Sequence, residues 1–143
     1  MNPADGRVVS NFIVQALRGQ DITVYGDGTQ TRSFQYIHDL VDGLIALMNS
    51  NESRPVNIGN GDEFTIKEFA ELVREIVGKV DGVSPSQQVD IIYRPIPEDD
   101  PRRRRPDTTR AKESLEWQPR WSVRMGVEEM ARYYKAKLAE GSI

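Results

Sequence analysis

The sequence contains no cysteine and a single histidine, His38. Without cysteine there are no disulfides, thiolate nucleophiles or thiolate metal sites. One histidine leaves no His-rich metal site, and a Ser-His-Asp arrangement could form only around His38. Catalytic chemistry would therefore have to come from Tyr, Lys, Arg, Asp or Glu side chains, or from a cofactor.

Long apolar runs are also missing, and neither sign of charge is in strong excess. No stretch is long enough to span a bilayer, and no signal peptide is visible. The 22 acidic and 19 basic residues give a net charge of −3 at pH 7, which argues against general binding to nucleic acid or anionic membranes. The 143 residues, 38% of them hydrophobic and 29% charged, are typical of about one globular domain.

Helical periodicity alternates with short strand-like runs in the first part of the chain. Apolar spacing predicts a helix over residues 9–17 that ends at Gly19, and β-propensity predicts a strand from Ile22 to Tyr25. The Gly-rich turn at residues 26–28 follows, and residues 33–37 are expected to form a second strand. Taken alone, this stretch predicts a hairpin.

The next segment is expected to be a helix followed by a short strand. Asp39 can cap the helix, and residues 56–58 are expected to form a brief buried strand. The predicted buried stripe of the helix consists of Leu40, Leu44, Leu47 and Met48, with Val41 and Ile45 alongside.

A capping box, Thr65 followed by Glu68, opens another predicted helix. Its apolar face consists of Ile66, Phe69, Ala70, Val73, Ile76 and Val77. The rest is expected to hold a loop over 78–88, a strand over 89–93, an irregular stretch over 95–106 and helices near 108–115 and 122–138. This alternation predicts an α/β fold, and because the strands are few, residues 1–143 are expected to be a single partial domain of a larger architecture.

Three motifs suggest catalytic or cofactor chemistry, but each has a simpler explanation. Residues 59–61, Gly-Asn-Gly, lie where a dinucleotide-binding GxGxxG would lie, yet Phe64 replaces the third glycine, which favours an ordinary turn. Tyr133 and Lys137 match Tyr-x-x-x-Lys, but they lie near the end of the chain, where coincidence is favoured. His38 has no partner at a meaningful spacing and is expected at the surface.

Four consecutive arginines, Arg102 to Arg105, form the strongest local charge. They could bind a polyanion, but the neighbouring acids Glu98, Asp99, Asp100 and Asp107 cancel much of their field. Binding of a single diphosphate by one or two guanidinium groups fits the pattern better. A solvated loop without function is an equally open alternative.

The segment from Tyr25 to Phe34, YGDGTQTRSF, is the most informative part of the sequence. Tyr25 precedes a Gly-rich turn and can present its ring face to a flat base. Arg32, seven residues later, could return to the same cleft and contact a phosphate.

Continued as FQYIHDLVDGL from Phe34, this segment resembles the extended short-chain dehydrogenase/reductases that act on nucleotide sugars. Three further blocks carry the resemblance: DGRVVSNFI at 5–13, PVNIGN at 55–60, and DDP at 99–101 with Arg104 and Pro106-Asp107. Their order and spacing are similar to those of UDP-glucuronate decarboxylases, nearly end to end over this chain.

The resemblance implies a reaction in which NAD⁺ oxidises C4 of UDP-glucuronate, CO₂ is lost, and the hydride returns to give UDP-xylose. In that scheme Tyr25 packs on uracil, and Arg32 holds the phosphates near the sugar and could assist protonation. The resemblance also implies that Arg104, with Arg102 as second choice, contacts the diphosphate. The residues implied to line the entrance to the substrate site are Arg7, Asn11 and Gln15.

The family's NAD-binding Rossmann core and catalytic Tyr-x-x-x-Lys would precede Met1, and Tyr133 with Lys137 cannot replace them. We therefore expect a C-terminal substrate-binding portion, with Met1 an internal methionine, that neither holds NAD nor decarboxylates alone. Unpaired strand edges predict a marginally stable or associating chain. By resemblance the full-length enzyme is a homodimer, in the cytoplasm or Golgi lumen. The alternatives are a related epimerase or dehydratase, or a non-catalytic polyanion-binding module using Arg102–Arg105.

Overall fold

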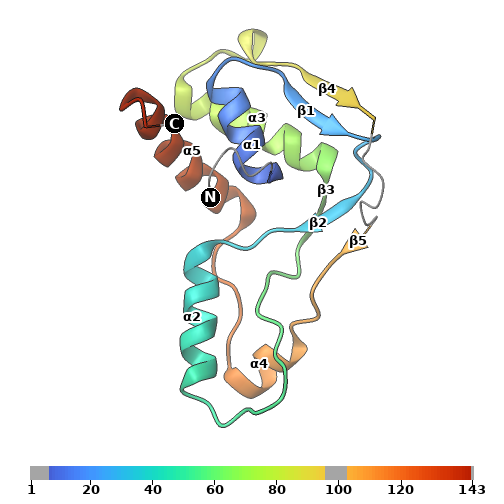
Figure 1. Ribbon diagram of the computed structural model, residues 1–143, viewed down its shortest axis with the longest axis vertical. Helices are drawn as coiled ribbons and strands as arrows, with labels where there is room; N and C mark the ends of the chain where they lie inside the picture. The colour runs from blue at the N-terminus through green and yellow to red at the C-terminus, as the bar shows by residue number, and fades with distance from the viewer. Residues whose placement is uncertain (1–6, 96–102, 143) are drawn as a thin grey trace.

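The computed structural model describes residues 7–95 and 103–142 (Figure 1). The elements are α1 (Val8–Leu17), β1 (Ile22–Tyr25), β2 (Thr31–Ser33), α2 (Ile37–Met48), β3 (Glu63–Thr65), α3 (Ile66–Asp81), a 3₁₀ turn (Pro85–Gln87), β4 (Ile91–Arg94), β5 (Arg103–Arg104), α4 (Thr109–Leu115) and α5 (Val123–Ala139). This is the expected mixture of helices and short strands. None of the helices in the described ranges is long and apolar enough to cross a membrane.

Helices α1, α3 and α5 pack together with β1 and β4 into what we call the helical lobe (Figure 1). Phe69 lies fully buried in its core, with its ring stacked 4.0 Å from that of Phe34 and 6.1 Å from that of Phe12 (centroid distances). The other core residues are aliphatic or aromatic side chains from the three helices and β1, among them Ile13, Ile22, Val24, Val73, Ile76, Val127 and Tyr134. Their burial from water stabilises the lobe.

The helix ends of the lobe follow local sequence signals. Thr65 accepts a hydrogen bond from the Glu68 backbone N–H, and the Glu68 carboxylate accepts one from the Thr65 N–H, so the expected capping box is confirmed. Gly82, at φ +73°, ends α3 in the left-handed conformation that glycine adopts without strain. The hydroxyl of Ser122 caps α5 by accepting from the Met125 N–H.

The strands form two small sheets, and the expected hairpin is wrong. β1 pairs in parallel with β4, which lies far along the chain, while β2 lies between antiparallel β3 and parallel β5. Gly26 and Gly28, both at φ +75°, turn the chain out of the first sheet, so that β2 cannot fold back on β1. The second strand also lies earlier than expected, at Thr31–Ser33 in place of residues 33–37, and Ile37 already begins α2.

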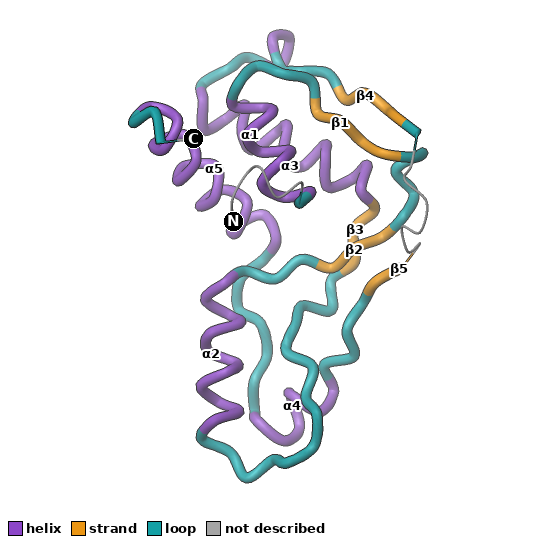
Figure 2. The backbone as a smooth tube through the Cα atoms, viewed as in Figure 1, coloured by secondary structure: helices purple, strands orange, loops and turns teal. Residues whose placement is uncertain are grey.

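Helices α2 and α4, with residues 49–62 and 105–121, extend away from the lobe and form what we call the α2–α4 arm (Figure 2). Asp39 does not cap α2. Its carboxylate is buried and accepts the backbone N–H groups of Arg120 and Trp121, at 2.9 and 3.0 Å. Gly43 brings α2 close to Ile58 and Trp117, because a Cβ at position 43 would overlap both side chains. Asp39 and Gly43 therefore fix α2 within the arm.

Two further expectations for the arm are corrected by the structure. Residues 56–58 pair with no strand of the described chain; the segment is held instead by the Asn57 Nδ2, which donates to the Asp107 carbonyl, and by Gly59, which packs against Pro106. The apolar stripe of α2 is not buried either: Leu44 and Met48 are 46% and 83% exposed. Both segments have the local residue pattern of a buried strand or helix, but no described element packs over their apolar side chains.

Candidate functional site

Tyr25 ends β1 at the point where the strand leaves the core. The three residues before it are buried, whereas Tyr25 is 44% exposed. The buried Gln30 donates from Nε2 to the Tyr25 carbonyl at 2.7 Å, and Thr29 bonds the Asp27 carboxylate through both its N–H and its hydroxyl. The turn after Tyr25 is therefore internally braced, and the phenol ring is presented from a fixed support.

Arg32 lies in the middle strand of the three-stranded sheet. Its Cα pairs with that of Arg104 on β5 and with that of Phe64 on β3. The backbone register therefore makes positions 32 and 104 direct neighbours on adjacent strands. Arg32 is half-buried, and its Nη1 donates to the Thr31 carbonyl at 2.7 Å. The side chain of Arg104, and the whole of Arg102, lie outside the described residues.

A carboxylate that the sequence did not reveal lies beside this row of arginines. Glu63 on β3 accepts a hydrogen bond from the Thr31 hydroxyl at 2.7 Å and forms an ion pair with Arg105 at 3.8 Å. β3 has only three residues, too few for a recognisable alternation, so its position next to β2 could not be predicted. The ion pair therefore links Arg105, which follows β5, to β3 on the other side of β2.

The three entrance residues expected on α1 share one face of that helix, because Arg7, Asn11 and Gln15 are four residues apart. Gln15 ties this face to β1: its side chain accepts from the Thr23 N–H at 3.1 Å and donates to the Thr23 hydroxyl at 3.3 Å. Thr23 and Tyr25 lie on the same side of β1, since strand side chains alternate. The α1 face therefore flanks the side of β1 from which Tyr25 emerges.

The remaining motifs form no catalytic arrangement in the described chain. Tyr133 is 57% exposed, and Lys137 pairs with Glu140 at 2.8 Å; this hydrogen bond raises the pKa of Lys137. The exposed His38 packs edge-on against the rings of Tyr36 and Trp121.

The Gly59–Gly61 turn is held by local contacts and by β2, since the Ser33 hydroxyl donates to the Asn60 carbonyl. The Asn60 side chain is buried and accepts from the Asp62 N–H at 2.9 Å, while Gly59 packs on Pro106. A phosphate cradle needs backbone N–H groups at a helix N-terminus, whereas this turn leads into β3 and α3 begins only at Ile66. Among the described residues, no three acidic or histidine side chains gather as a metal site.

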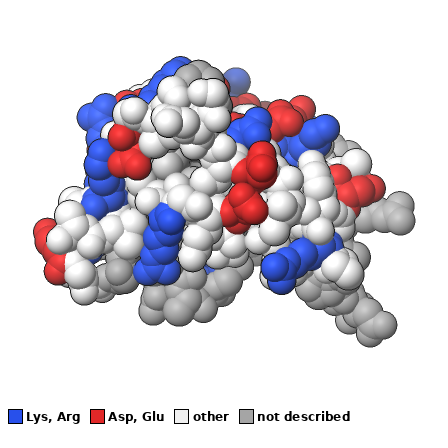
Figure 3. Space-filling model, turned by 90° about the horizontal axis from the view of Figure 1, so that it is seen from above, with Lys and Arg blue, Asp and Glu red and all other residues white. Residues whose placement is uncertain are grey.

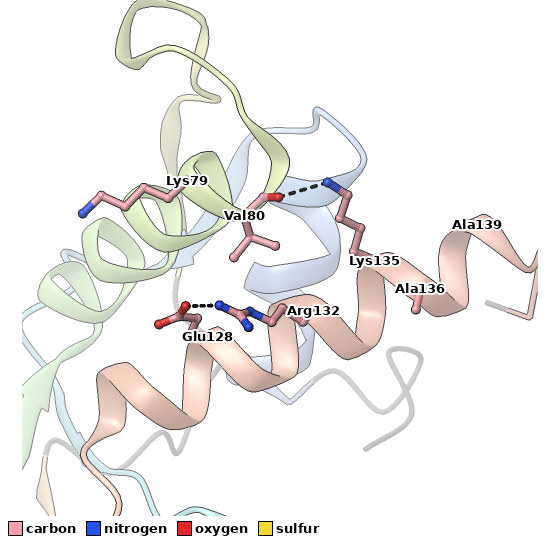
Figure 4. Close-up of a pocket in the computed structure, with 7 residues that line it drawn as sticks. All are labelled: Lys79, Val80, Glu128, Arg132, Lys135, Ala136 and Ala139. Carbon is pink, nitrogen blue, oxygen red and sulfur yellow. Dashed lines mark hydrogen bonds and ion pairs between the residues drawn. The ribbon is translucent and has the colours of Figure 1, made fainter.

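A groove of about 640 Å³ between the end of α3 and α5 is lined by charged and small residues (Figure 4). Each of its charged residues has a partner: Arg132 pairs with Glu128 at 2.6 Å, Lys79 with Glu75 at 2.6 Å, and Lys135 with Asp81 and the Val80 carbonyl, both at 3.0 Å. Viewed from above, basic and acidic residues are interspersed across the lobe and form no field of one sign (Figure 3). The groove therefore offers little to a charged ligand.

The sequence of this chain matches the model of a known protein family over most of its length. The family model for GDP-mannose 4,6-dehydratase matches residues 3–130, and the chain belongs to this family. UDP-glucuronic acid decarboxylase 1 from Danio rerio is 49% identical over 138 residues, which are 96% of this chain and 31% of the relative. UDP-glucuronic acid decarboxylase 3 from Arabidopsis thaliana is also 49% identical over 138 residues, covering 96% of this chain and 38% of the relative.

Solved structures agree with this assignment. UDP-glucose 4-epimerase from Thermotoga maritima, solved with UDP-glucose, superposes with a TM-score of 0.81 and 30% identity over 92% of this chain and 40% of its own. UDP-glucuronic acid 4-epimerase from Bacillus cereus, in complex with UDP-glucuronic acid and NAD, superposes with a TM-score of 0.78 and 25% identity. This match covers 97% of this chain and 41% of the epimerase chain. These matches confirm the α/β fold class and the recognised family. The chain spans about a third of the length of the curated relatives above.

Proposed function

We propose that this chain is the substrate-binding portion of an NAD-dependent UDP-glucuronate decarboxylase, a single partial domain that grips the nucleotide sugar. The observation that carries the proposal is the register of the small sheet, which sets Arg32 beside position 104. Identity of 46–49% to UDP-glucuronic acid decarboxylases over 94–96% of the chain supports this substrate class.

The chemistry of the site suits a uridine diphosphate. A diphosphate carries two negative charges, and the guanidinium fork of arginine matches phosphate oxygens with paired hydrogen bonds. Arg32 and Arg104 would hold the diphosphate from adjacent strands, with Arg102 as second choice. The half-exposed ring of Tyr25 provides a flat apolar surface for the uracil base. Arg7 and Asn11 would line the entrance beside Gln15, which also holds α1 to β1.

The described residues do not fit NAD. The only Gly-x-Gly turn between an extended segment and a helix in the described chain is closed by Asn60 and Pro106, and the Tyr133–Lys137 pair is exposed at the surface. We therefore propose that this chain alone neither holds NAD nor releases CO₂ from UDP-glucuronate. No step of the reaction is assigned to its residues beyond substrate binding and the assisting role of Arg32.

Binding of UDP-glucuronate to the purified chain, measured by calorimetry, tests the site directly. Arg32→Ala should weaken binding about tenfold to a hundredfold, since a charge-assisted contact contributes about 1.5 to 3 kcal/mol. Arg32→Lys should weaken binding less than Arg32→Ala, because lysine keeps the positive charge but lacks the forked pair of hydrogen-bond donors. Uridine without phosphates should bind both variants as it binds the wild type. Arg18→Ala, an exposed arginine at the end of α1, is the matched control.

A chimera tests the reaction itself. This chain would replace the matching region of the Danio rerio decarboxylase, and the product from UDP-glucuronate would be identified. CO₂ release supports the decarboxylase, whereas inversion at C4 would identify the epimerase alternative. In the chimera, Arg32→Ala should lower turnover as well as apparent affinity while NAD content stays constant.

Two results would overturn the assignment. Unchanged affinity and kinetics for Arg32→Ala would remove Arg32 from the site. Retention of the chain on heparin with a steep salt dependence would favour the polyanion-binding alternative. We expect the chain to flow through heparin at physiological salt, because its net charge is −3.

A further inference from the structure

The four consecutive arginines, Arg102 to Arg105, cannot set their own position on the small sheet. β5 has only two residues, Arg103 and Arg104, and pairs with β2 in parallel. Register is weakly specified in strands that are polar on both faces. Because the residues of the run are identical, a shift by one or two positions would exchange one arginine for another. The arginine that stands beside Arg32 must therefore be fixed by contacts outside β5.

Two contacts on the C-terminal side of the run fix where it ends. Pro106 packs against Gly59, where an added Cβ would lie 2.7 Å from Cγ of the proline. The Asp107 carbonyl accepts a hydrogen bond from Nδ2 of Asn57 at 3.1 Å. Both contacts hold the chain to the loop that precedes β3. They lie beyond the last arginine, so they do not attach β5 to the sheet.

Glu63 supplies a link between the arginine run and the other strands of the sheet. Its carboxylate accepts the Thr31 hydroxyl at 2.7 Å and lies 3.8 Å from Nη1 of Arg105, the residue directly after β5. Glu63 belongs to β3 and Thr31 to β2, the strand between β3 and β5 (Figure 2). One carboxylate thus connects all three strands. The Glu63 side chain is 20% exposed, so its pair with Arg105 is partly shielded from water.

We propose that Glu63 is a positioning residue of the diphosphate site: it holds Arg105, and with it β5, so that position 104 stays beside Arg32. This inference rests on the proposed function, in which Arg32 and Arg104 bind the diphosphate from adjacent strands. Glu63 does not contact the diphosphate itself, since a carboxylate repels phosphate oxygens. It acts through the backbone of residues 103–105, whose register with β2 decides which guanidinium group reaches the ligand.

The opposite effect is expected if Glu63 is only a counter-charge. A carboxylate near two phosphate-binding arginines lowers the positive potential there, so its removal would strengthen phosphate binding. Loss of a positioning residue weakens binding instead, because β5 no longer holds position 104 in place. Glu63→Asp separates the two roles. It keeps the negative charge but shortens the side chain by one methylene, which withdraws the carboxylate from Thr31 and Arg105.

Calorimetric titration of the complete chain with UDP-glucuronate tests the positioning role. Glu63→Asp should weaken binding about twofold to fivefold, the effect expected for losing a partly exposed ion pair. Uridine, which lacks phosphates, should bind as it binds the wild type. Without ligand, amide hydrogen exchange of residues 103–105 should accelerate while the α3 amides keep their protection. Asp62→Glu, at the exposed acid next to Glu63, is the matched control and should change none of these.

A double-mutant cycle shows whether Glu63 acts through Arg104. In the Arg104→Ala background, Glu63→Asp should cause no further loss of affinity, because the guanidinium group that it positions is gone. Three outcomes overturn the proposal: unchanged or tighter binding of UDP-glucuronate by Glu63→Asp, an equal effect of Glu63→Asp in both backgrounds, or an equal loss of affinity for uridine, which indicates a general structural defect.

Failure of the positioning role can be distinguished from failure of the proposed function. A loss of affinity in Arg32→Ala without one in Glu63→Asp removes the positioning role and leaves the substrate site in place. If the wild type does not bind UDP-glucuronate, or if Arg32→Ala and Arg104→Ala both bind it like the wild type, the proposed function fails and the positioning role fails with it.

Discussion

The helical lobe and the α2–α4 arm contain helices of similar design but bury them very differently. α3 in the lobe buries seven of its sixteen residues, whereas α2 in the arm buries two of its twelve, Asp39 and Gly43. Yet α2 is the more apolar helix of the two. An apolar helix is thus not a buried helix: burial depends on whether other elements of the same chain reach it.

The two regions are also held by different forces. Apolar packing around Phe69, to which the helices α1, α3 and α5 all contribute side chains, stabilises the lobe. In the arm, the described contacts are directional and few. The Asp39 carboxylate accepts two backbone N–H groups, α2 approaches its neighbours closely at Gly43, and the Asn57 side chain donates to the Asp107 carbonyl. We therefore expect the lobe to unfold as one cooperative unit and the arm to open locally at lower free energy.

The largest effect should follow from removing the centre of the lobe. Phe69→Ala deletes a fully buried ring that stacks on Phe34, and we expect it to lower the free energy of unfolding by about 3 to 5 kcal/mol. Urea denaturation followed by circular dichroism measures this change. Ile76→Val, a smaller deletion in the same core, should cost about 0.5 to 1.5 kcal/mol and keeps the test informative if Phe69→Ala fails to fold. A loss below 1 kcal/mol for Phe69→Ala would contradict the assignment of the core.

A smaller and local effect should follow from removing the Asp39 carboxylate. Asp39→Ala leaves the N–H groups of Arg120 and Trp121 without their charged acceptor, and we expect a loss of about 1.5 to 3 kcal/mol. Hydrogen exchange should accelerate at residues 37–48 and 120–121 while the amides of α3 keep their protection. Asp42→Ala, at an exposed acid of the same helix, is the control. Equal acceleration throughout the lobe would show that the two regions unfold together.

The smallest effect should come from the charged surface of the lobe. Glu75 on α3 accepts both Arg124 Nη groups, at 3.1 and 3.0 Å, and the Lys79 ammonium at 2.6 Å. The hydrogen bonds from Arg124, and then from Lys79, lower the pKa of Glu75 from 4.5 to about 2. Since the pKa is lower in the folded state, the pair stabilises the fold above pH 4.5 and loses this contribution as the pH falls towards 2.

Because the Glu75 side chain is 44% exposed, water and salt screen most of this interaction. Glu75→Gln should therefore shift the urea midpoint only slightly at pH 7 and low salt, less than Asp39→Ala. The wild-type and Glu75→Gln midpoints should converge as the pH falls from 4.5 to 2, and also at high salt. Glu71→Gln, one turn earlier on α3, should show no such convergence. A difference that persisted at pH 2 would disprove the linkage.

Several elements could be predicted from the sequence because their signals are local. The capping box at Thr65, the apolar period of α3 and the glycine stop after α1 act within a few residues of themselves, and the structure confirms all three. The candidate binding residues Tyr25 and Arg32 were found in the same way, from a short segment with a characteristic order of residues.

Strand pairing could not be predicted, because the partners are far apart in the chain. β1 pairs with β4, and β2 with β3 and β5, so a turn that looked like a hairpin joins two different sheets. The position of Glu63 beside Thr31 and Arg105 depends on this pairing and carries no sequence signal of its own.

The sequence by itself determined where α1 ends and where α3 begins, which residue types stand at the candidate site, and the family to which the chain belongs. Only the tertiary structure decided that Arg32 and position 104 are neighbours, that Asp39 anchors α2 instead of capping it, and that no described residue covers the apolar face of α2. The physical reason is that hydrogen bonding and apolar period within a helix are set by residues a turn apart. Burial and register are set by whichever distant segments the rest of the chain brings into contact.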